Sequence, residues 1–541
     1  MTTISQKPTG NNGDSSYKWE VLSIAILGTF MAILDSSIVN VALPHLMVTF
    51  SANLEQIEWV STGYMLAFAI LMPVTTWLRD AIGLRNAFAL ALLCFTAGSA
   101  LCGLAWNLDS LIFFRVIQAI GGGAIMPTGL TMVSEVFPPH QRGMALGVWG
   151  AGATVAPALG PTIGGYLLDY VDWRAIFYIN VPIGAIVIAM TMVIVKASTG
   201  HRGSYKFDFF GFFFLSIALA GMLIGVTQGE REGWTSAYIL SLFAVSYFSF
   251  FTFLITESVV KHPIISLQIF KIRNFSITCV LGAARSIALF SSVFLMPLFL
   301  QRLLGYSAFD TGLLLMPSAL SVAIAMPLAG KLTDHIGPKA PYVIGGLITA
   351  YSFYIYSELS LNSTYGFMLY GLILRGAGMG FLMAPITVAA MNSVPQKMMS
   401  LASGLLNLIM QVSAAFGIAV FGSFLTRRQM FHQETYVTYF TPDNAPLNML
   451  LAKIKAALIL SGSSLDTVTS KAYAVVASYF QRWATSNAFD DCFLVSAYII
   501  FVCSFLVLLL EDIYPKKGIF GRFKSAGKLT QEHYKSGPGG E

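Results

Sequence analysis

The chain has 541 residues, of which 56% are hydrophobic and 11% are charged, and its formal net charge is +6. Charged residues make up about 25% of an ordinary globular protein, so this composition argues against a soluble globular fold and indicates lipid as the solvent. A bilayer core about 30 Å thick needs roughly 20 apolar residues per helix. The length accommodates fourteen such helices with short loops.

Apolar runs separated by polar residues predict these fourteen spans. The first six are expected near residues 19–43, 56–78, 86–105, 108–134, 144–168 and 174–196. Two more are expected near 208–228 and 236–257, and the last six near 275–301, 310–331, 341–360, 364–391, 401–425 and 489–511. The first run is too long for a signal-peptide core and lacks a convincing cleavage site, so we expect it to be retained.

Basic residues predict that both ends of the chain are cytoplasmic, because positively charged loops stay on that side of a membrane. With the N-terminus inside, the cytoplasmic segments hold 20 of the 32 Lys and Arg residues. The short outer loops hold only Arg174, Arg231 and Arg302. We therefore expect a multi-pass protein of the cell membrane, with a bacterial inner membrane as the expected location.

The sequence also contains an internal repeat. MPVTTWLRDAIGLR at 72–85 reappears as MPLAGKLTDHIGPK at 326–339, each time at the end of the second helix of a six-helix group. Arg115 and Arg375 form a second echo, each followed by a Gly-rich run and a Pro. The predicted order is six, two and six helices. The expected parts are an N-terminal segment 1–18, a first half 19–196, a linker with two helices 197–274, a second half 275–511 and a basic tail 512–541.

Four further motifs lie in the first half. They are LDSSIVNVALP at 34–44, LIFFRVIQAIGGG at 111–123, APALGPTIGG at 156–165 and DWRAIFYINVPIG at 172–184. Together with the repeat they resemble the major facilitator superfamily, and more narrowly its fourteen-span drug:proton antiporter branch of the EmrB and QacA type. The resemblance covers nearly the whole chain. It implies an all-α integral membrane protein with the major facilitator fold and a substrate site at the midplane between two halves.

Both copies of the repeat resemble the superfamily loop pattern G-x-L-x-D-x-x-G-x-[RK]. The resemblance assigns a cytoplasmic gating role to Asp80, Gly83, Arg85, Gly330, Asp334, Gly337 and Lys339. The first copy departs from the pattern, because Thr76 replaces the leading Gly and Arg79 precedes the aspartate. Asp80 and Asp334 are expected to accept hydrogen bonds from helix N-termini, or from Arg85 and Lys339, and so to latch the halves. Solvated loop carboxylates are the alternative.

The fifth predicted helix carries the antiporter motif, whose candidate residues are Gly152, Pro157, Gly160, Pro161, Gly164 and Gly165. Small residues recur there every four positions and give one face that a neighbouring helix can approach closely. The two prolines remove backbone donors and are expected to bend the helix. Our hypothesis is that this seam seals or rocks during exchange, with ordinary packing as the alternative.

Asp35 is the only acidic residue well inside any predicted span. Burying a carboxylate in a bilayer costs about 2.5 kcal/mol or more, so Asp35 is the predicted proton-coupling residue, with a structural hydrogen bond as the alternative. A rise of 1.5 Å per residue places Asp35 roughly 13 Å and Arg115 roughly 10 Å from the outer ends of their helices. We therefore expect a pair that forms and breaks during transport.

Arg285 and Arg375 are both expected roughly 15 Å deep, near the midplane. With Arg115 they are predicted to shape the substrate cavity or a charge relay. Three arginines against one aspartate favour acidic or neutral amphiphiles over lipophilic cations. The alternative is that carbonyl groups or a helix C-terminus satisfy each arginine.

The long outer segment 427–488 contains two amphipathic stretches, NMLLAKIKAAL and KAYAVVASYFQRW. Their apolar faces predict packing onto the transporter as a cap, or onto a partner. The resemblance to the EmrB type makes a periplasmic adaptor and an outer-membrane channel candidate partners. The basic tail is predicted to bind anionic lipid; its basic residues include Lys516, Lys517, Arg522, Lys524 and Lys528.

The prediction for function is a proton-coupled exporter of hydrophobic or amphiphilic small molecules, a multidrug efflux antiporter working by alternating access. A dedicated exporter of one metabolite, such as a siderophore or fatty acid, and a non-transporting membrane receptor or scaffold are the alternatives. No enzyme, cofactor, metal site or nucleic-acid partner is expected, with the proton gradient as the energy source. The five cysteines lie in or beside apolar runs without metal-ligand spacing.

Overall fold

The computed structural model describes residues 12–197, 207–261, 263–437, 445–461 and 464–511, and within these residues it contains helices and no strand. The N-terminal residues 1–11 and the basic tail beyond 511 lie outside the described residues, so the predicted lipid contact of the tail stays a prediction.

The first half holds six spans. Its helices are α1 (Asn12–Thr49), α2 (Leu54–Leu71), α3 (Val74–Ile82), α4 (Leu84–Gly103), α5 (Leu108–Val136), α6 (Arg142–Tyr170), α7 (Ala175–Tyr178) and α8 (Asn180–Ile194). Pro73 stands between α2 and α3, which together form one span bent by 56°. Asn53 and Asn107 close capping boxes at the starts of α2 and α5, where their side chains satisfy amide groups that have no partner within the helix.

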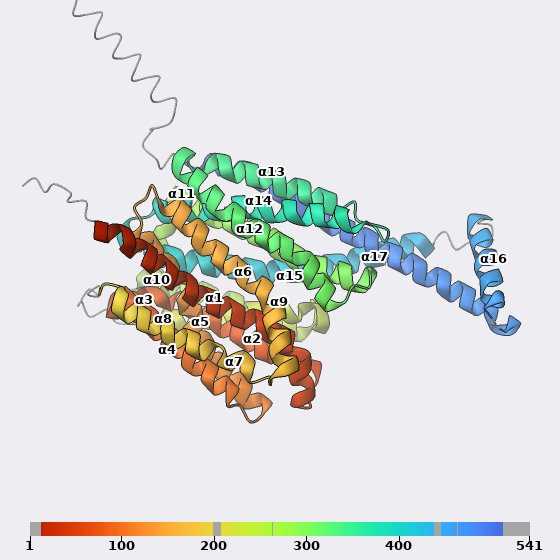
Figure 1. The fold of residues 1–541 in the computed structure, drawn as a ribbon, viewed down its shortest axis with the longest axis horizontal. Coiled ribbons are helices and arrows are strands. Elements are labelled where there is room, and N and C mark those ends of the chain that lie inside the picture. The colour runs from red at the N-terminus through yellow and green to blue at the C-terminus, as the bar shows by residue number, and fades with distance from the viewer. Residues whose placement is uncertain (1–11, 198–206, 262, 438–444, 462–463, 512–541) are drawn as a thin grey trace, which may run out of the picture.

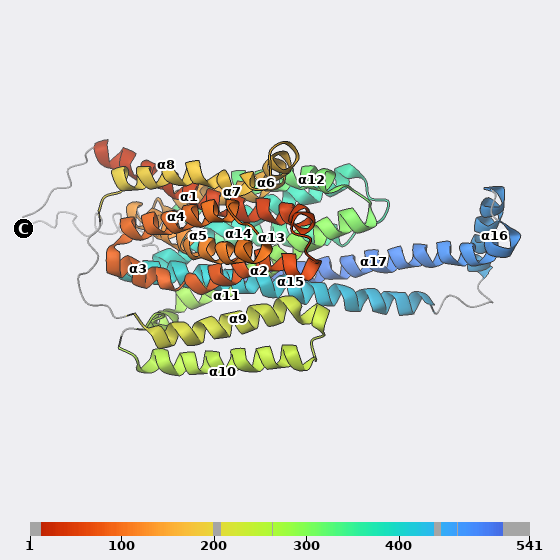
Figure 2. The same ribbon diagram turned by 90° about the horizontal axis from the view of Figure 1, so that it is seen from below.

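The inserted pair is α9 (Phe209–Glu232) and α10 (Ala237–Val259). The second half consists of η1 (Leu267–Lys271), α11 (Arg273–Leu298), η2 (Phe299–Leu303), α12 (Ala308–Ile336), α13 (Lys339–Tyr356), α14 (Tyr365–Ser393), η3 (Gln396–Met398), α15 (Met399–Val437), α16 (Ala445–Leu460), α17 (Leu465–Leu506) and η4 (Val507–Leu509). In Figure 2, α9 and α10 lie together at one side of the bundle. There α9 contacts α2 and α15.

The described residues contain twelve helices that are long and apolar enough to cross a membrane, or thirteen when the bent α2 and α3 pair counts as one span. The third helix of the second half, α13, is not among them, although it lies along α14 and α17 as a span would. Every predicted span corresponds to a helix or a bent helix pair. The predicted fourteen are therefore consistent with the structure, which confirms the all-α membrane fold.

The glycine shared by both copies of the repeat is required by the backbone conformation at that position. Gly83 ends α3 with φ 82°, and Gly337 ends α12 with φ 86°. This left-handed conformation is costly for any residue with a side chain. Each glycine turns the chain from the second helix of its half into the third, so the two halves share the same local construction.

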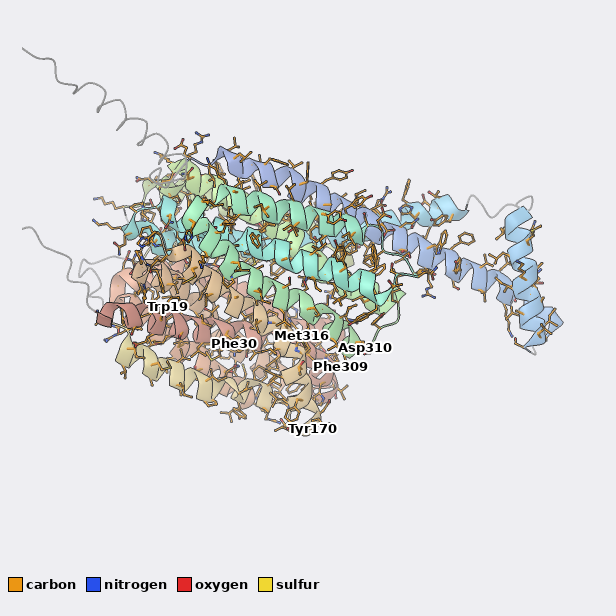
Figure 3. The ribbon with its side chains drawn as sticks, turned by 45° about the horizontal axis from the view of Figure 1, so that its top comes forward. Trp19, Phe30, Tyr170, Phe309, Asp310 and Met316 are labelled. Atoms are coloured by element: carbon orange, nitrogen blue, oxygen red, sulfur yellow. The ribbon has the colours of Figure 1, made fainter. Side chains whose placement is uncertain are left out.

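We call the end of the bundle where α1 begins and α17 ends the terminus side, and the opposite end the α16 side (Figure 1). Figure 3 shows Trp19 on the terminus side and Tyr170, Phe309 and Asp310 towards the α16 side. On the terminus side one apolar cluster joins both halves, for example Leu22 and Phe137 with Met391 and Leu405. On the α16 side of the first half, a separate cluster contains residues of that half only.

Most of the segment 427–488 is helical. The last turns of α15 and the first turns of α17 extend beyond the rest of the bundle, and α16 lies at the far end of this projection (Figures 1 and 2). Asp491 ties α17 to α15 by accepting hydrogen bonds from Arg428 Nε at 2.6 Å and His432 Nε2 at 2.7 Å. Apolar residues of α16 pack on the projecting part of α17. Among the described residues of this segment, α16 lies beyond the bundle rather than over it (Figure 2), while Arg482 of α17 donates to the Leu303 carbonyl at 2.7 Å.

Candidate functional site

Asp35 lies at the centre of a buried polar cluster in the first half. Its side chain has no exposed surface. Arg115 Nη1 donates to Asp35 Oδ2 at 2.6 Å, so the expected ion pair between α1 and α5 is present. Gln118 Nε2 and Asn180 Nδ2 donate to Asp35 Oδ1 at 2.9 and 2.7 Å. Both carboxylate oxygens are therefore satisfied, as a charge away from water requires.

Arg115 is held equally firmly. Its guanidinium carbon lies 4.1 Å from the ring centre of Tyr64, and Nη1 also donates to Gln118 Oε1 at 2.6 Å. Cations over aromatic faces gain about 2 kcal/mol or more when desolvated. The arginine is 1% exposed. The pair is thus a closed, neutral unit in the present state of the protein.

Sequence reasoning missed the residues that complete this cluster. Ser99 Oγ accepts from Asn180 at 2.9 Å and from Gln118 at 3.1 Å, and it donates to the Phe177 carbonyl. Two signals were available in the sequence. Gln118 stands one helical turn after Arg115, on the same face, and Asn180 lies within the motif DWRAIFYINVPIG.

Arg285 in α11 has a different environment. It is 4% exposed, and its Nη2 lies 2.8 Å from the thioether sulfur of Met410. Nε and Nη1 have no hydrogen-bond partner among the described residues. A thioether is a weak acceptor, so this guanidinium lacks the acceptors that a buried cation normally has.

Arg375 in α14 is satisfied by hydroxyl groups. Its Nη1 donates to Ser292 Oγ at 2.6 Å, and its Nη2 donates to Ser318 Oγ at 3.1 Å. No carboxylate among the described residues lies within ion-pair distance of Arg285 or Arg375. Arg285 and Arg375 are therefore cations without a carboxylate partner among the described residues, whereas Asp35 and Arg115 neutralise one another in the first half.

The second copy of the repeat latches the two halves on the terminus side. Asp334 at the end of α12 accepts from the backbone N–H groups of Gly143 at 2.7 Å and Met144 at 2.9 Å. These amides begin α6, where the helix dipole favours a negative charge. The expectation that Asp334 accepts from a helix N-terminus is confirmed. The same ends also meet through Arg142, which donates to Asn392 at 2.7 Å.

The first copy of the repeat contacts the second half through Arg79, the residue that departs from the superfamily loop pattern. Arg79 Nη2 donates to Glu135 at 2.6 Å, and its Nη1 lies 3.4 Å from the Lys397 carbonyl just before α15. Asp80 lies 3.9 Å from Arg79, and Arg85 Nε lies 3.4 Å from Asn86 rather than on Asp80. Arg79 and Glu135 are thus contact residues that the motif alone did not indicate.

The small-residue face predicted on the fifth span lies inside the first half. A Cβ atom at Gly152, Gly160 or Gly164 would meet side chains of α1, and one at Gly165 would meet nothing. The close contact between the halves is made by Gly143, Gly147 and Gly150 against α12. Gly152, Gly160 and Gly164 therefore lie where a neighbouring helix approaches closely, and that helix is α1, because α6 turns its first glycines to α12 and the later ones to α1. The hypothesis that this face seals or rocks during exchange stays a prediction.

The sequence of residues 25–418 matches the Major Facilitator Superfamily. The chain belongs to this superfamily. It is 31% identical over 94% of its length to the uncharacterized MFS-type transporter YhcA of Bacillus subtilis, covering 96% of that protein. It is also 32% identical over 78% of its length to the multidrug resistance protein Stp of Mycobacterium tuberculosis, covering 79% of that protein. The multidrug export protein EmrB of Escherichia coli is 28% identical over 80% of this chain and 86% of its own length.

Membership of the major facilitator superfamily confirms the predicted EmrB-like resemblance and makes the protein a membrane transporter of small molecules rather than an enzyme. It also relates the two polar regions to one expected substrate site. The Asp35 cluster and the two cationic residues of the second half lie in opposite six-helix halves, between which this superfamily binds its substrates.

The ion pair predicts a large stability effect for a single substitution. Arg115→Gln leaves the buried carboxylate of Asp35 without its cation, and breaking a buried pair in this way costs about 3–5 kcal/mol. Asp35→Asn combined with Arg115→Gln removes both charges and is expected to recover most of that loss. Thermal unfolding of the purified variants in detergent measures both effects. A double variant as unstable as the sum of the two single variants would contradict the pairing.

Proposed function

We propose that the protein is a proton-coupled antiporter that exports hydrophobic or amphiphilic small molecules, with both chain termini in the cytoplasm of a bacterial cell. The observation that carries the proposal is the buried Asp35 and Arg115 pair, surrounded by neutral donors that can hold either charge state. Protonation of Asp35 removes the attraction for Arg115. Binding of a proton to Asp35 can therefore shift the equilibrium between two arrangements of α1 and α5. Such a proton-dependent shift is what coupling requires.

The present structure fits one end state of alternating access. The halves are joined on the terminus side by Asp334, Arg142 and Arg79, together with a shared apolar core. With cytoplasmic termini, this is the state closed to the cytoplasm. The cycle then requires these contacts to separate and the corresponding contacts on the α16 side to form.

The direct test uses the purified protein in liposomes. An imposed pH gradient is expected to drive accumulation of an amphiphilic substrate, and an ionophore that collapses the gradient is expected to stop it. Competition between chemically unrelated amphiphiles is expected for a multidrug exporter, the function named in the relatives Stp and EmrB. Strict selectivity for one compound would instead indicate a dedicated exporter, and absence of any flux would indicate a receptor or scaffold.

The proposed substrates are acidic or neutral amphiphiles. Arg285→Gln is expected to reduce export of an aromatic acid about tenfold or more, because a charge-assisted hydrogen bond contributes about 1.5–3 kcal/mol. Export of the uncharged amide of the same compound should change far less. Initial efflux rates of the two compounds measure this selectivity.

The control is Arg302→Gln, which removes an exposed arginine of the same half. Equal losses for the acid and the amide in Arg285→Gln would count against a charge-recognition role. Strong preference of the unmodified protein for quaternary ammonium dyes over weak acids would also contradict this substrate class.

The projecting helices supply a surface for the predicted adaptor. Exposed apolar side chains cover α16 and the adjoining part of α17, among them Met449, Leu460, Tyr479 and Trp483. Such a patch outside the bundle indicates contact with another molecule. A periplasmic adaptor joined to an outer-membrane channel stays a prediction for this surface.

A further inference from the structure

A cavity of about 650 Å³ lies on the terminus side of the first half, apart from the Asp35 cluster. Its wall is formed by residues of α1, α4 and α5, by the chain just after α8, and by Gln396 of the second half. Lys18 in this wall precedes Asp35 on α1 by seventeen residues, which corresponds to roughly 25 Å along the helix. The cavity is therefore not part of the proposed transport site.

Three cations from three separate helix ends line the cavity. They are Lys18 at the start of α1, Arg85 at the start of α4 and Lys196 just after α8. Lys18 donates to the amide oxygen of Gln141 at 2.7 Å, and Arg85 lies against the amide oxygen of Asn86. Glu135 is the carboxylate in this lining, and Arg79 already holds it at 2.6 Å. Lys18 and Arg85 thus face neutral amide oxygens, while Arg79 neutralises Glu135, so these two cations keep their positive charge in this lining.

Much of the rest of the lining is apolar. Five of its side chains are aliphatic or methionine, and all of them except Val136 are buried: Val21, Leu84, Met132, Val136 and Val195. A cavity lined by both cations and aliphatic side chains matches a molecule with an anionic head and hydrocarbon chains. Free inorganic phosphate would leave the aliphatic part unused.

The position of the cavity agrees with that of a lipid headgroup. Tyr17 in the lining and Trp19 are both near the start of α1, and Figure 3 shows Trp19 on the terminus side. Tyr and Trp concentrate at the level where headgroups meet the hydrocarbon core. Trp19 is exposed, and so are the lining residues Lys196 and Ala197. The cavity therefore opens at the surface of the protein on this side.

We propose that this cavity is a binding site for an anionic phospholipid. The phosphate group lies between Lys18 and Arg85, and the first part of an acyl chain lies along Val21, Leu84 and Val195. Basic pockets between membrane helices bind anionic headgroups in this way. Gln396 gives the headgroup a hydrogen-bonding side chain from the second half, so the lipid contacts both halves where they are closed.

The test measures lipid binding to the full-length protein in neutral detergent micelles. Dioleoyl phosphatidylglycerol is added, with dioleoyl phosphatidylcholine and glycerol phosphate as comparison probes, and binding is followed by the rise in melting temperature and by native mass spectrometry. Each basic residue near an anionic lipid contributes roughly fivefold to binding, so Lys18→Gln combined with Arg85→Gln is expected to weaken phosphatidylglycerol binding about 25-fold. Lys261→Gln combined with Lys271→Gln removes two exposed lysines and is expected to bind as the unmodified protein does.

A second variant guards against a folding defect. Ala197→Trp places an indole at the exposed rim of the cavity without removing a charge, and it is expected to weaken phosphatidylglycerol binding as well. Equal binding by the cavity variants and the lysine control would overturn the proposal. A response to glycerol phosphate as strong as that to phosphatidylglycerol would also overturn it, by showing a site for free phosphate. An equal response to phosphatidylcholine would show that the anionic head is not recognised.

Discussion

Asp35→Asn is expected to abolish efflux driven by a pH gradient while the protein stays folded. Asparagine has nearly the same shape as aspartate, so its oxygen can still accept from Gln118 or Asn180, the present donors to Asp35. It cannot take up or release a proton. We expect gradient-driven transport to fall roughly 100-fold or more, since the loss removes the coupling event itself rather than one contact among many.

Two measurements separate coupling from stability in this variant. Exchange of labelled for unlabelled substrate without a gradient is expected to continue, because exchange needs movement of the halves but no net proton transfer. Asp109→Asn is the matched control, since it changes an exposed aspartate at the start of α5 in the same half. A folded Asp35→Asn protein that still concentrates substrate in response to a pH gradient would refute the role of Asp35.

Gly330→Ala is expected to prevent closure of the halves on the terminus side. A Cβ atom at Gly330 would collide with the backbone carbonyl of Gly143, which cannot rotate away as a side chain can. Moving α12 from α6 would also lengthen the two hydrogen bonds that Asp334 accepts at the start of α6. Because closed interfaces pack as tightly as protein interiors, we expect transport to fall about tenfold or more. Efflux rates and the melting temperature of the purified protein measure the effect.

Gly312→Ala provides the matched control, because it makes the same change in the same helix. A Cβ at Gly312 would meet nothing within contact distance, and alanine favours a helix over glycine by about 1 kcal/mol. This variant is expected to transport normally. Similar transport by the two alanine variants would show that the contact between Gly143 and Gly330 is not needed for the cycle.

The amino-acid sequence was sufficient for the architecture. Apolar run lengths match the helices because the bilayer forces each spanning segment to satisfy its own backbone and to hide its polar groups. The repeat identified the two halves, and its glycines keep a left-handed turn after α3 and α12. The sequence also predicted that Asp35 and Arg115 lie at similar depth, because the rise per residue of a regular helix relates residue number to distance along the helix axis.

The tertiary structure decided which polar groups meet and which do not. Three arginines looked alike in the sequence, yet Arg115 is paired with a carboxylate, Arg375 donates to two serine hydroxyls and Arg285 has only a thioether. It also placed the motif face at Gly160 against α1 and the close contact between the halves at Gly143, and it brought Arg79 to Glu135. These facts depend on the rotation of each helix about its axis and on its neighbours in the bundle. Both follow from packing between segments far apart in the chain, so neither the periodicity nor the spacing of the sequence could determine them.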